Sequence, residues 1–224
     1  QEILSMYILA PSILAADFRT LGKEMELTEE AGAEYIHFDV MDGMFVPSIS
    51  FGMPVLQSIK GATSQVMDAH LMVQEPIRYI EDFKRAGADI VTVHLEACGD
   101  VDATIKKIRS SGMKAGLSIC PDTKAEEAKR YLPDIDMLLV MSVHPGFGGQ
   151  KFIPESLEKI RALRTMTDAL GLDTDIEVDG GIYHSNAREV LDAGANVIVA
   201  GSAVFGGDTM KNTKEFMEIL KDYE

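Results

Sequence analysis

The sequence has 224 residues, of which 46% are apolar and 25% are charged, and its formal net charge is −15. This length suits one large domain or two small ones, and the apolar content is enough for a buried core, which argues against a disordered chain. The negative charge disfavours nucleic acid and anionic membrane surfaces as partners, because both require a basic footprint. A phosphorylated ligand would have to be held by local groups against an unfavourable overall field.

The start of the chain is apolar but does not resemble a targeting segment. Residues 1–5 are interpreted as a non-native extension that precedes Met6, and residues 6–224 as a single catalytic domain. The apolar run over 3–16 lacks a basic region before it and contains Pro11, so we expect a first strand and its loop rather than a signal peptide.

The two cysteines, Cys98 and Cys120, are not in a spacing typical of metal ligands. We interpret them as reduced thiols and expect a cytoplasmic protein. No run of the sequence reaches the ~18 uninterrupted apolar residues of a membrane helix, which also favours a protein without membrane spans.

Short apolar runs alternate along the chain with longer segments of helical periodicity. Eight runs are predicted as strands: Tyr7–Leu9, Tyr35–Phe38, Val66–Leu71, Ile90–Val93, Lys114–Ile119, Met137–Met141, Asp175–Val178 and Val197–Ala200. Helical spacing is found at Leu21/Met25, Ile77/Ile80/Phe83, Val101/Ile105/Ile108, Leu157/Ile160/Leu163 and Phe216/Ile219/Leu220. This alternation indicates βαβ units and a parallel sheet.

Nearly the same tripeptide joins three of these units: Ala31-Gly32-Ala33, Ala86-Gly87-Ala88 and Ala193-Gly194-Ala195. A glycine there suits a left-handed residue at a helix C-terminus that leads into the next strand. Eight units in 224 residues match a single (β/α)8 TIM barrel. An open doubly wound sheet would instead require GxGxxG after the first strand, where residues 11–14 contain no glycine.

Polar side chains gather where the predicted strands end, which is where such barrels carry their chemistry. Residues two apart in a strand share a face, so the in-phase pairs are His37 with Asp39, Asp68 with His70, and Glu177 with Asp179. A single histidine is more often a core residue than a ligand. Several such groups left dry and unpaired would each cost kilocalories, however. We therefore predict one divalent ion, Zn²⁺, Mn²⁺, Fe²⁺ or Co²⁺, on His37, Asp39, His70 and Asp179.

A phosphate site is predicted from glycines at the last two strands. Gly180 and Gly181 follow the seventh strand, and Gly201 and Ser202 follow the eighth. We expect each turn to open a helix and to bind the phosphate mainly through backbone N–H groups, because neither turn contains Lys or Arg.

Further residues are expected to surround the substrate. The glycine-rich run over 144–150, with Phe147 among its glycines, suits a lid that excludes water, although an ordinary surface loop is the alternative. Met41, Met72 and Met141 stand at equivalent strand ends, where we expect them to line the cavity.

Five ordered motifs span essentially the whole chain. They are APSILAADF at 10–18, HFDVMDG at 37–43, DAHLMV at 68–73, HPGFGGQ at 144–150 and EVDGG at 177–181. Together they resemble the ribulose-phosphate 3-epimerase family, whose members are ribulose-phosphate-binding barrels. The resemblance implies metal ligation by His37, Asp39, His70 and Asp179, and an acid–base pair of Asp39 and Asp179. It also implies substrate contacts from Ser12, His70, Gly146, Phe147, Gly148, Gly149, Gly180, Gly181, Gly201 and Ser202.

The reaction expected from this resemblance belongs to the pentose phosphate pathway. D-ribulose 5-phosphate would become D-xylulose 5-phosphate by inversion at carbon 3, through a metal-stabilised enediolate and without an organic cofactor. One aspartate removes a proton from one face while the other, protonated, returns one to the opposite face, so that the pair carries one proton.

Some residues depart from the family pattern. Met44 and Ser48 stand where many relatives have His or Asn, and His144 where Asn, Glu or Asp is frequent. None belongs to the predicted metal set, but they bear on sugar preference, and D-allulose 6-phosphate 3-epimerase is the alternative activity.

Other functional classes lack their signatures. A Schiff-base aldolase needs a lysine at a strand end, whereas Lys114 opens its strand on the structural side. A related decarboxylase would carry Asp-x-Lys-x-x-Asp, and a metal hydrolase His-x-His on the first strand; neither is present. A non-catalytic sugar-phosphate-binding barrel stays as a remote alternative, since binding alone gives no reason for two carboxylates beside two histidines. A homo-oligomer is expected.

Overall fold

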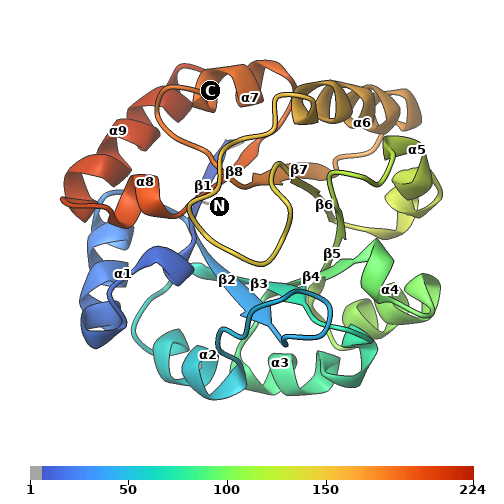
Figure 1. The fold of residues 1–224 in the computed structure, drawn as a ribbon, viewed down its shortest axis with the longest axis horizontal. Coiled ribbons are helices and arrows are strands. Elements are labelled where there is room, and N and C mark those ends of the chain that lie inside the picture. Colours follow the sequence, from blue (N-terminus) through green and yellow to red (C-terminus); the bar gives the residue numbers. More distant parts are fainter. Residues whose placement is uncertain (1–6) are drawn as a thin grey trace.

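A ring of eight parallel strands forms the centre of the protein in the computed structural model, which describes residues 7–224 (Figure 1). The strands are β1 (Ile8–Pro11), β2 (Tyr35–Met41), β3 (Val66–Met72), β4 (Ile90–His94), β5 (Lys114–Ile119), β6 (Met137–Met141), β7 (Asp175–Asp179) and β8 (Val197–Ala200). From β2 to β8 each strand pairs with the next in sequence, and β8 pairs with β1. The ring is completed by an isolated parallel bridge between Ser12, directly after β1, and His37 of β2. The predicted (β/α)8 barrel and all eight predicted strands are confirmed.

Helices surround this ring on the outside (Figure 1). They are α1 (Leu21–Glu30), α2 (Met53–Lys60), α3 (Ile80–Ala86), α4 (Val101–Ser110), α5 (Ala125–Ala128), α6 (Ser156–Leu170), α7 (Ala187–Asp192), α8 (Ser202–Phe205) and α9 (Thr209–Lys221). None of the helices within residues 7–224 combines the length and the apolar character that crossing a membrane requires. The prediction that residues 1–5 are a non-native extension concerns a segment outside the described residues.

The joints between helices and strands explain the repeated Ala-Gly-Ala sequence. Gly32, Gly87 and Gly194 have φ of 104°, 105° and 112°, in the region that favours glycine over residues with a Cβ. Each lies directly at the end of a helix, as the sequence pattern predicts. The same local solution therefore returns the chain to the sheet three times.

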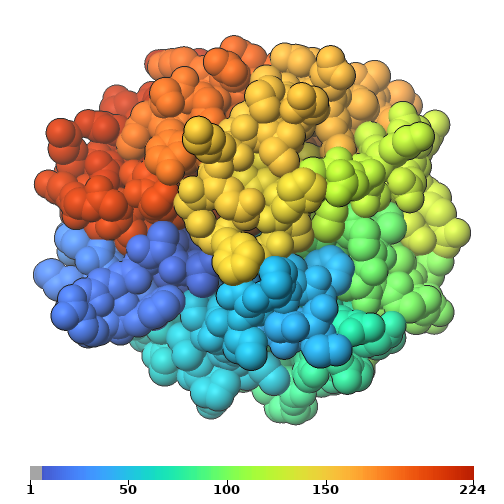
Figure 2. Space-filling view, viewed as in Figure 1, coloured from blue at the N-terminus to red at the C-terminus, as the bar shows by residue number. Residues whose placement is uncertain are grey.

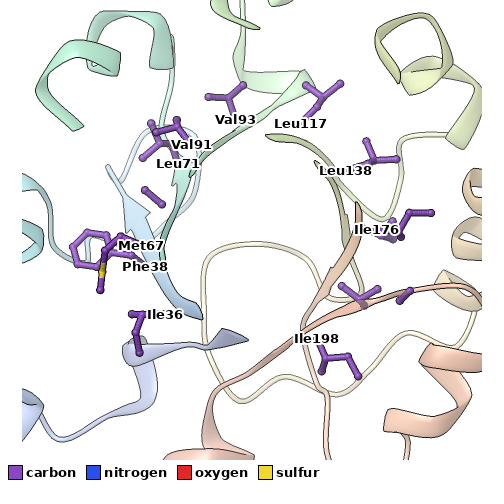
Figure 3. Packing of buried hydrophobic residues seen from close by; sticks show 14 of the residues in the cluster. Ile36, Phe38, Met67, Leu71, Val91, Val93, Leu117, Leu138, Ile176 and Ile198 are labelled. Atoms are coloured by element: carbon purple, nitrogen blue, oxygen red, sulfur yellow. The ribbon is translucent and has the colours of Figure 1, made fainter. Parts of the chain in front are cut away.

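The two faces of each strand have different environments. Outward side chains such as Ile36, Phe38 and Leu138 pack between the sheet and the helices in one large apolar cluster (Figure 3). The inward face is apolar where β1, β6 and β8 contribute to it, through residues such as Leu139 and Val199. On β2, β3, β4 and β7 it is polar, and seven side chains there are almost fully buried: His37, Asp39, Asp68, His70, Thr92, His94 and Glu177.

Polar inward residues carry a cost that only specific pairing offsets. In the ladder between β2 and β3, His37 stands opposite Asp68 and Asp39 opposite His70, so that each imidazole has a carboxylate on the neighbouring strand. This register places the candidate functional side chains together in the barrel interior.

Gly116 on β5 offers a test of how tightly the barrel interior is packed. A Cβ at this position would lie 2.1 Å from Oγ1 of Thr92 and 3.1 Å from its Cα. We expect Gly116→Ala to lower the free energy of unfolding by roughly 1–3 kcal/mol, the usual cost of overpacking a core. Urea unfolding measures this difference. Gly61→Ala is the control, because a Cβ there meets nothing within 4 Å; equal effects of the two substitutions would contradict the packing described.

Candidate metal-assisted acid–base site

A cavity of about 330 Å³ opens at the carboxyl ends of the strands. Its size is within the range of small-molecule sites. The predicted residues among its lining are Ser12, Asp39, Met41, Met72, Met141, Gly146, Phe147, Gly148, Gly149, Asp179, Gly180, Gly181, Gly201 and Ser202. His37 and His70 are fully buried and are not among the described residues that line it. Direct contact of His70 with a substrate stays a prediction.

Four side chains from three strands meet beside this cavity: His37 and Asp39 of β2, His70 of β3 and Asp179 of β7, hereafter the His/Asp cluster. Nε2 of His37 lies 3.2 Å from Nδ1 of His70 and 3.3 Å from Oδ1 of Asp39. Oδ1 of Asp39 is 3.0 Å from Nδ1 of His70. Oδ2 of Asp179 is 3.8 Å from His37 and 3.7 Å from His70. One nitrogen or oxygen of each residue thus points to a common centre.

These separations fit a single divalent metal ion. Ligand atoms about 2.0–2.2 Å from a tetrahedral zinc ion lie roughly 3.4 Å from one another. The measured separations of 3.0–3.8 Å bracket that value. Two imidazoles and two carboxylates also suit Zn²⁺, Mn²⁺, Fe²⁺ or Co²⁺ by ligand type. The His/Asp cluster can therefore hold a divalent ion without rearrangement of the backbone.

Two acidic residues, Asp68 and Glu177, lie behind His37. Nδ1 of His37 is 2.6 Å from Oδ2 of Asp68 and 3.4 Å from Oε1 of Glu177, and all three side chains are fully buried. Burial, followed by the charge of Asp68, raises the pKa of Glu177 well above its usual range, so Glu177 is protonated. Burial opposes a charged His37, but the charges of Asp39 and Asp68 raise its pKa well above the ordinary value. Asp68 thereby fixes the proton on Nδ1 and leaves Nε2 to face the cluster.

The two aspartates have opposite pKa shifts. Burial raises the pKa of Asp179 to about 7, and the negative charge of Asp39 adds to the rise. Burial also acts on Asp39, but His37 and His70 outweigh it and hold the pKa of Asp39 well below its usual range. Two carboxylates so close together in a poorly solvated site do not both ionise readily. The opposite shifts suit one base and one acid that titrate as a coupled unit, and the catalytic role of the pair stays a prediction.

Hydroxyl groups hold Asp39 in place. The Ser12 hydroxyl donates to Oδ2 of Asp39 at 2.5 Å, while Oδ1 faces the histidines. Ser50 donates to the carbonyl of Asp39 at 2.6 Å and accepts from the N–H of Met41 at 2.9 Å. β2 continues to Met41, three residues beyond its predicted end, so Asp39 lies within the strand rather than in a loop. A strand holds a catalytic group more rigidly than a loop does.

The glycine turns have partly different roles from those predicted. The expectation that each opens a helix is right for Gly201, which directly precedes α8, and wrong for Gly180 and Gly181, because α7 begins only at Ala187. A Cβ on Gly181 would lie 2.4 Å from the backbone nitrogen of Phe152. The pair is thus required at least in part because the chain after β6 packs directly on it. Phosphate binding at these glycines stays a prediction.

The segment between β6 and α6 crosses the mouth of the cavity. Figure 2 shows its gold surface against the blue surface of the chain that follows β2. A Cβ on Gly146 would lie 3.0 Å from Cδ of Pro47, so the two segments touch. Gln150 donates to the carbonyls of His144 and Phe147, at 2.7 and 2.9 Å, and holds the segment in a compact turn. Phe147 lines the cavity but is 59% exposed, as a residue at an entrance would be.

Two further residues are functional candidates that the sequence did not predict. The hydroxyl of Tyr183 lies 3.1 Å from Oγ of Ser202, and both residues line the cavity near its glycine turns. Tyr183 is in a loop, where no periodicity marks it. His94 ends β4 in phase with Thr92, a signal that was available, and its Nε2 lies 2.8 Å from Nε2 of His70. Burial lowers the pKa of His94 to about 4 and also lowers that of His70, so both rings are neutral.

Metal binding by the His/Asp cluster should stabilise the fold. Zn²⁺ or Co²⁺ at 100 times its Kd should add about 2.7 kcal/mol to the free energy of unfolding, or roughly 5–10 °C in Tm for a chain of this size. Calorimetry measures this stabilisation as the change in Tm when the ion is added. His37→Gln should abolish the increase, whereas His144→Gln should retain it because His144 is outside the cluster. An increase that survives His37→Gln would place the ion elsewhere.

The raised pKa of Asp179 predicts a pH-dependent cost in the metal-free protein. A carboxyl with a folded pKa of about 7 and an ordinary unfolded value binds its proton more tightly when folded. Relative to Asp179→Asn, the wild-type chain should be equally stable near pH 4 and should lose stability as the pH rises to about 7, by at most about 4 kcal/mol. Urea unfolding with a chelator present measures both proteins. If the free energies of unfolding of the two proteins changed in parallel with pH, the raised pKa of Asp179 would be contradicted.

Comparisons with known proteins agree with this geometry. Residues 8–205 match the sequence model of the ribulose-phosphate 3 epimerase family. A ribulose-phosphate 3-epimerase of Synechocystis sp. is 54% identical over 200 residues, which are 88% of this chain and 87% of that protein. One of Bacillus subtilis is 47% identical over 207 residues, covering 92% and 95%. The thiamine phosphate pyrophosphorylase structure from Pyrococcus furiosus has the same fold, with a TM-score of 0.67, 19% identity and 97% coverage of both chains. The chain belongs to the ribulose-phosphate 3-epimerase family.

Proposed function

We propose that this chain inverts carbon 3 of D-ribulose 5-phosphate to give D-xylulose 5-phosphate. Its family membership supports the reaction type, since the relatives above are named for it. The observation that carries the mechanism is the pair of carboxyls with opposite pKa shifts, Asp39 lowered and Asp179 raised to about 7, in the wall of one cavity. An epimerase needs one base and one acid on opposite sides of a planar intermediate.

In the proposed direction, Asp39 accepts the proton from carbon 3 and Asp179 donates a proton to the opposite face. The intermediate is an enediolate, whose negative charge is shared by the oxygens on carbons 2 and 3. In the reverse direction the two aspartates exchange roles. Ser12, which donates to Oδ2 of Asp39, orients the carboxylate and leaves Oδ1 toward the histidines.

The His/Asp cluster would hold a divalent ion, which when bound supplies Lewis-acid stabilisation of negative charge on the substrate oxygens. Asp68 holds His37 in the orientation that this requires. The methionines at the ends of β2, β3 and β6 give the cavity an uncharged wall: Met41, Met72 and Met141. Such a wall keeps water and competing charges away from the intermediate.

The phosphate group is assigned to the end of the cavity that holds Gly180, Gly181, Gly201 and Ser202. No Lys or Arg is found among the described residues that line the cavity, so backbone N–H groups and hydroxyls would bind the phosphate. The hydroxyl of Tyr183 adds a donor beside Ser202. The segment with Gly146–Gly149 would then close over the substrate, with Phe147 at the entrance.

We also propose a cytoplasmic enzyme that works as a homo-oligomer. Cys98 and Cys120 are free thiols, as is usual in a reducing compartment. Phe18, 53% exposed beside Phe51, is an apolar surface group of the kind that a second copy covers. Light scattering of the purified chain measures its oligomeric state.

Removal of either carboxyl should stop the reaction. We expect Asp39→Asn and Asp179→Asn each to lower kcat for ribulose 5-phosphate by at least about 10²–10⁴-fold, because positioned proton transfer contributes that much. A coupled assay for xylulose 5-phosphate measures the rates, and circular dichroism checks the fold. Asp102→Asn on the exposed face of α4 is the matched control and should keep full activity.

Two results would contradict the proposal. Near-normal turnover by either aspartate variant would remove the two-base mechanism. A kcat/KM higher for allulose 6-phosphate than for ribulose 5-phosphate would keep the mechanism but replace the substrate.

A further inference from the structure

The buried His94 and the exposed Glu96 form a hydrogen-bonded chain behind His70, on the side away from the His/Asp cluster. His70 directs Nδ1 to Asp39 at 3.0 Å and Nε2 to Nε2 of His94 at 2.8 Å. The two rings lie within 26° of parallel. Nδ1 of His94 lies 3.3 Å from Oε2 of Glu96. The contacts therefore run from Oε2 of Glu96 through Nδ1 and Nε2 of His94 to Nε2 of His70. The other nitrogen of that ring, Nδ1, is the predicted metal-binding atom.

Glu96 is anchored as a carboxylate at the outer end of this chain. Its Oε1 accepts from the backbone N–H of Cys120 at 2.7 Å and from the Thr123 hydroxyl. Burial opposes ionisation, but these bonds and the one to His94 lower the pKa of Glu96 to about 2. An ionised carboxylate only accepts hydrogen bonds. Oε2 therefore accepts, and the imidazole nitrogen facing it is Nδ1 of His94 at 3.3 Å, which Sγ of Cys120 also approaches to 3.5 Å.

The direction of every hydrogen bond in the chain follows from this anchor. A neutral imidazole carries one N–H, so a His94 that donates from Nδ1 has a bare Nε2. That Nε2 must accept, which puts the N–H of His70 on Nε2 and leaves Nδ1 of His70 with a free lone pair. The free lone pair points into the His/Asp cluster, where a metal ligand needs it.

The opposite direction is unfavourable for metal binding and for Glu96, although in the metal-free chain it would give Asp39 a donor. Nδ1 of His70 would then carry the proton and donate to Oδ1 of Asp39, which removes two ligand atoms from the metal at once. At the other end, the lone pair of His94 would face the carboxylate of Glu96. Without Glu96, however, nothing prevents His70 from donating to Asp39, because that contact is only 3.0 Å long.

We propose that Glu96 and His94 are positioning residues that fix His70 in the tautomer protonated on Nε2, so that its Nδ1 is free to bind the metal. This inference rests on the metal site of the proposed function, but not on the identity of the substrate. It also excludes a second metal on His94, Glu96 and Cys120, although their ligand atoms lie within 4.8 Å of one another. A metal there would require Nδ1 of His94, which the chain uses as a donor.

Nitrogen NMR of histidine-labelled protein tests the tautomers directly, in the wild-type chain and without metal. We expect the spectrum to give His70 protonated on Nε2 and His94 protonated on Nδ1, and Zn²⁺ to shift only Nδ1 of His70. A His70 protonated on Nδ1 in the metal-free protein would overturn the proposal. A wild-type chain that binds no Zn²⁺ would contradict the metal site of the proposed function instead, since the tautomers are measured separately.

Substitutions at the anchor test its influence on metal affinity. In Glu96→Gln the amide oxygen would keep the bonds to Cys120 and Thr123, so the NH₂ group would face His94 and reverse the chain. We expect NMR to show that reversal and Zn²⁺ affinity, measured by chelator competition, to fall about 10–100-fold. An unchanged affinity and unchanged tautomers in Glu96→Gln would overturn the proposal.

Two substitutions of His94 separate the hydrogen bond from packing. His94→Phe keeps a ring against Phe45 but removes the acceptor for His70, and should weaken Zn²⁺ binding by a similar factor. His94→Gln restores an acceptor and should recover most of the affinity. Equal Zn²⁺ affinities in the two variants would mean that His94 contributes only by packing.

Cys120→Ala is the control for a second metal. It should leave one Zn²⁺ per chain with wild-type affinity, because Oε2 of Glu96 still faces Nδ1 of His94 when the thiol, 3.5 Å from that nitrogen, is removed. Loss of a second equivalent of Zn²⁺ in this variant would show that His94 binds metal and would overturn the assignment.

Discussion

Two carboxylates, Asp39 and Asp179, approach the same point of a barrel interior from which water is largely excluded. Their mutual repulsion is the constraint on which the rest of the site depends. A proton on one of them or a divalent cation between them relieves it, and both solutions suit proton transfer at a carbon next to a carbonyl group. Asp179 is 16% exposed at its side chain and carries the raised pKa, whereas Asp39 is surrounded by two imidazoles. The asymmetry between two identical side chains thus comes entirely from their neighbours.

The polar groups continue into the buried centre of the barrel. Asp68 and Glu177 lie behind His37, and His94 lies behind His70, with the exposed Glu96 beyond it. A protein that needed only a stable core would place apolar side chains here, as it does on β6 and β8. The burial of apolar side chains in the other half of the interior, and in the outer cluster between sheet and helices, therefore offsets the cost of burying these polar groups. Each ligand histidine then meets the cluster with a defined nitrogen.

The barrel could be predicted from the sequence because the patterns that indicate it are local. Strand runs have a period of two, helices a longer one, and Ala-Gly-Ala marks the joints, so element types and the inward faces of β2, β3 and β7 could be deduced without coordinates. The in-phase spacing of His37 with Asp39 was enough to bring them together. Helix boundaries were less accessible: α7 begins at Ala187 rather than at the glycine pair, because the chain after β6 occupies that space.

What the sequence could not reveal depends on contacts between distant segments. Glu96 lies in a short turn after β4, and its partners Cys120 and Thr123 follow β5, 24 and 27 residues away. Ser50 extends β2 through a side-chain bond that spans 11 residues. No periodicity encodes such pairs. Isolated buried histidines such as His94 are usually core residues, and only the neighbouring ring of His70 gives this one a role.

A single turnover in deuterium oxide is the most direct test of the central claim that two aspartates act on opposite faces of one intermediate. Ribulose 5-phosphate with ordinary hydrogen at carbon 3 would be mixed with excess metal-loaded enzyme, and the xylulose 5-phosphate formed would be analysed by mass spectrometry. Because the acid that completes the reaction has exchanged its proton with solvent, the product should carry deuterium at carbon 3 from the first turnover. A product that retains its original hydrogen would mean that one group carries the proton across, and would contradict the account.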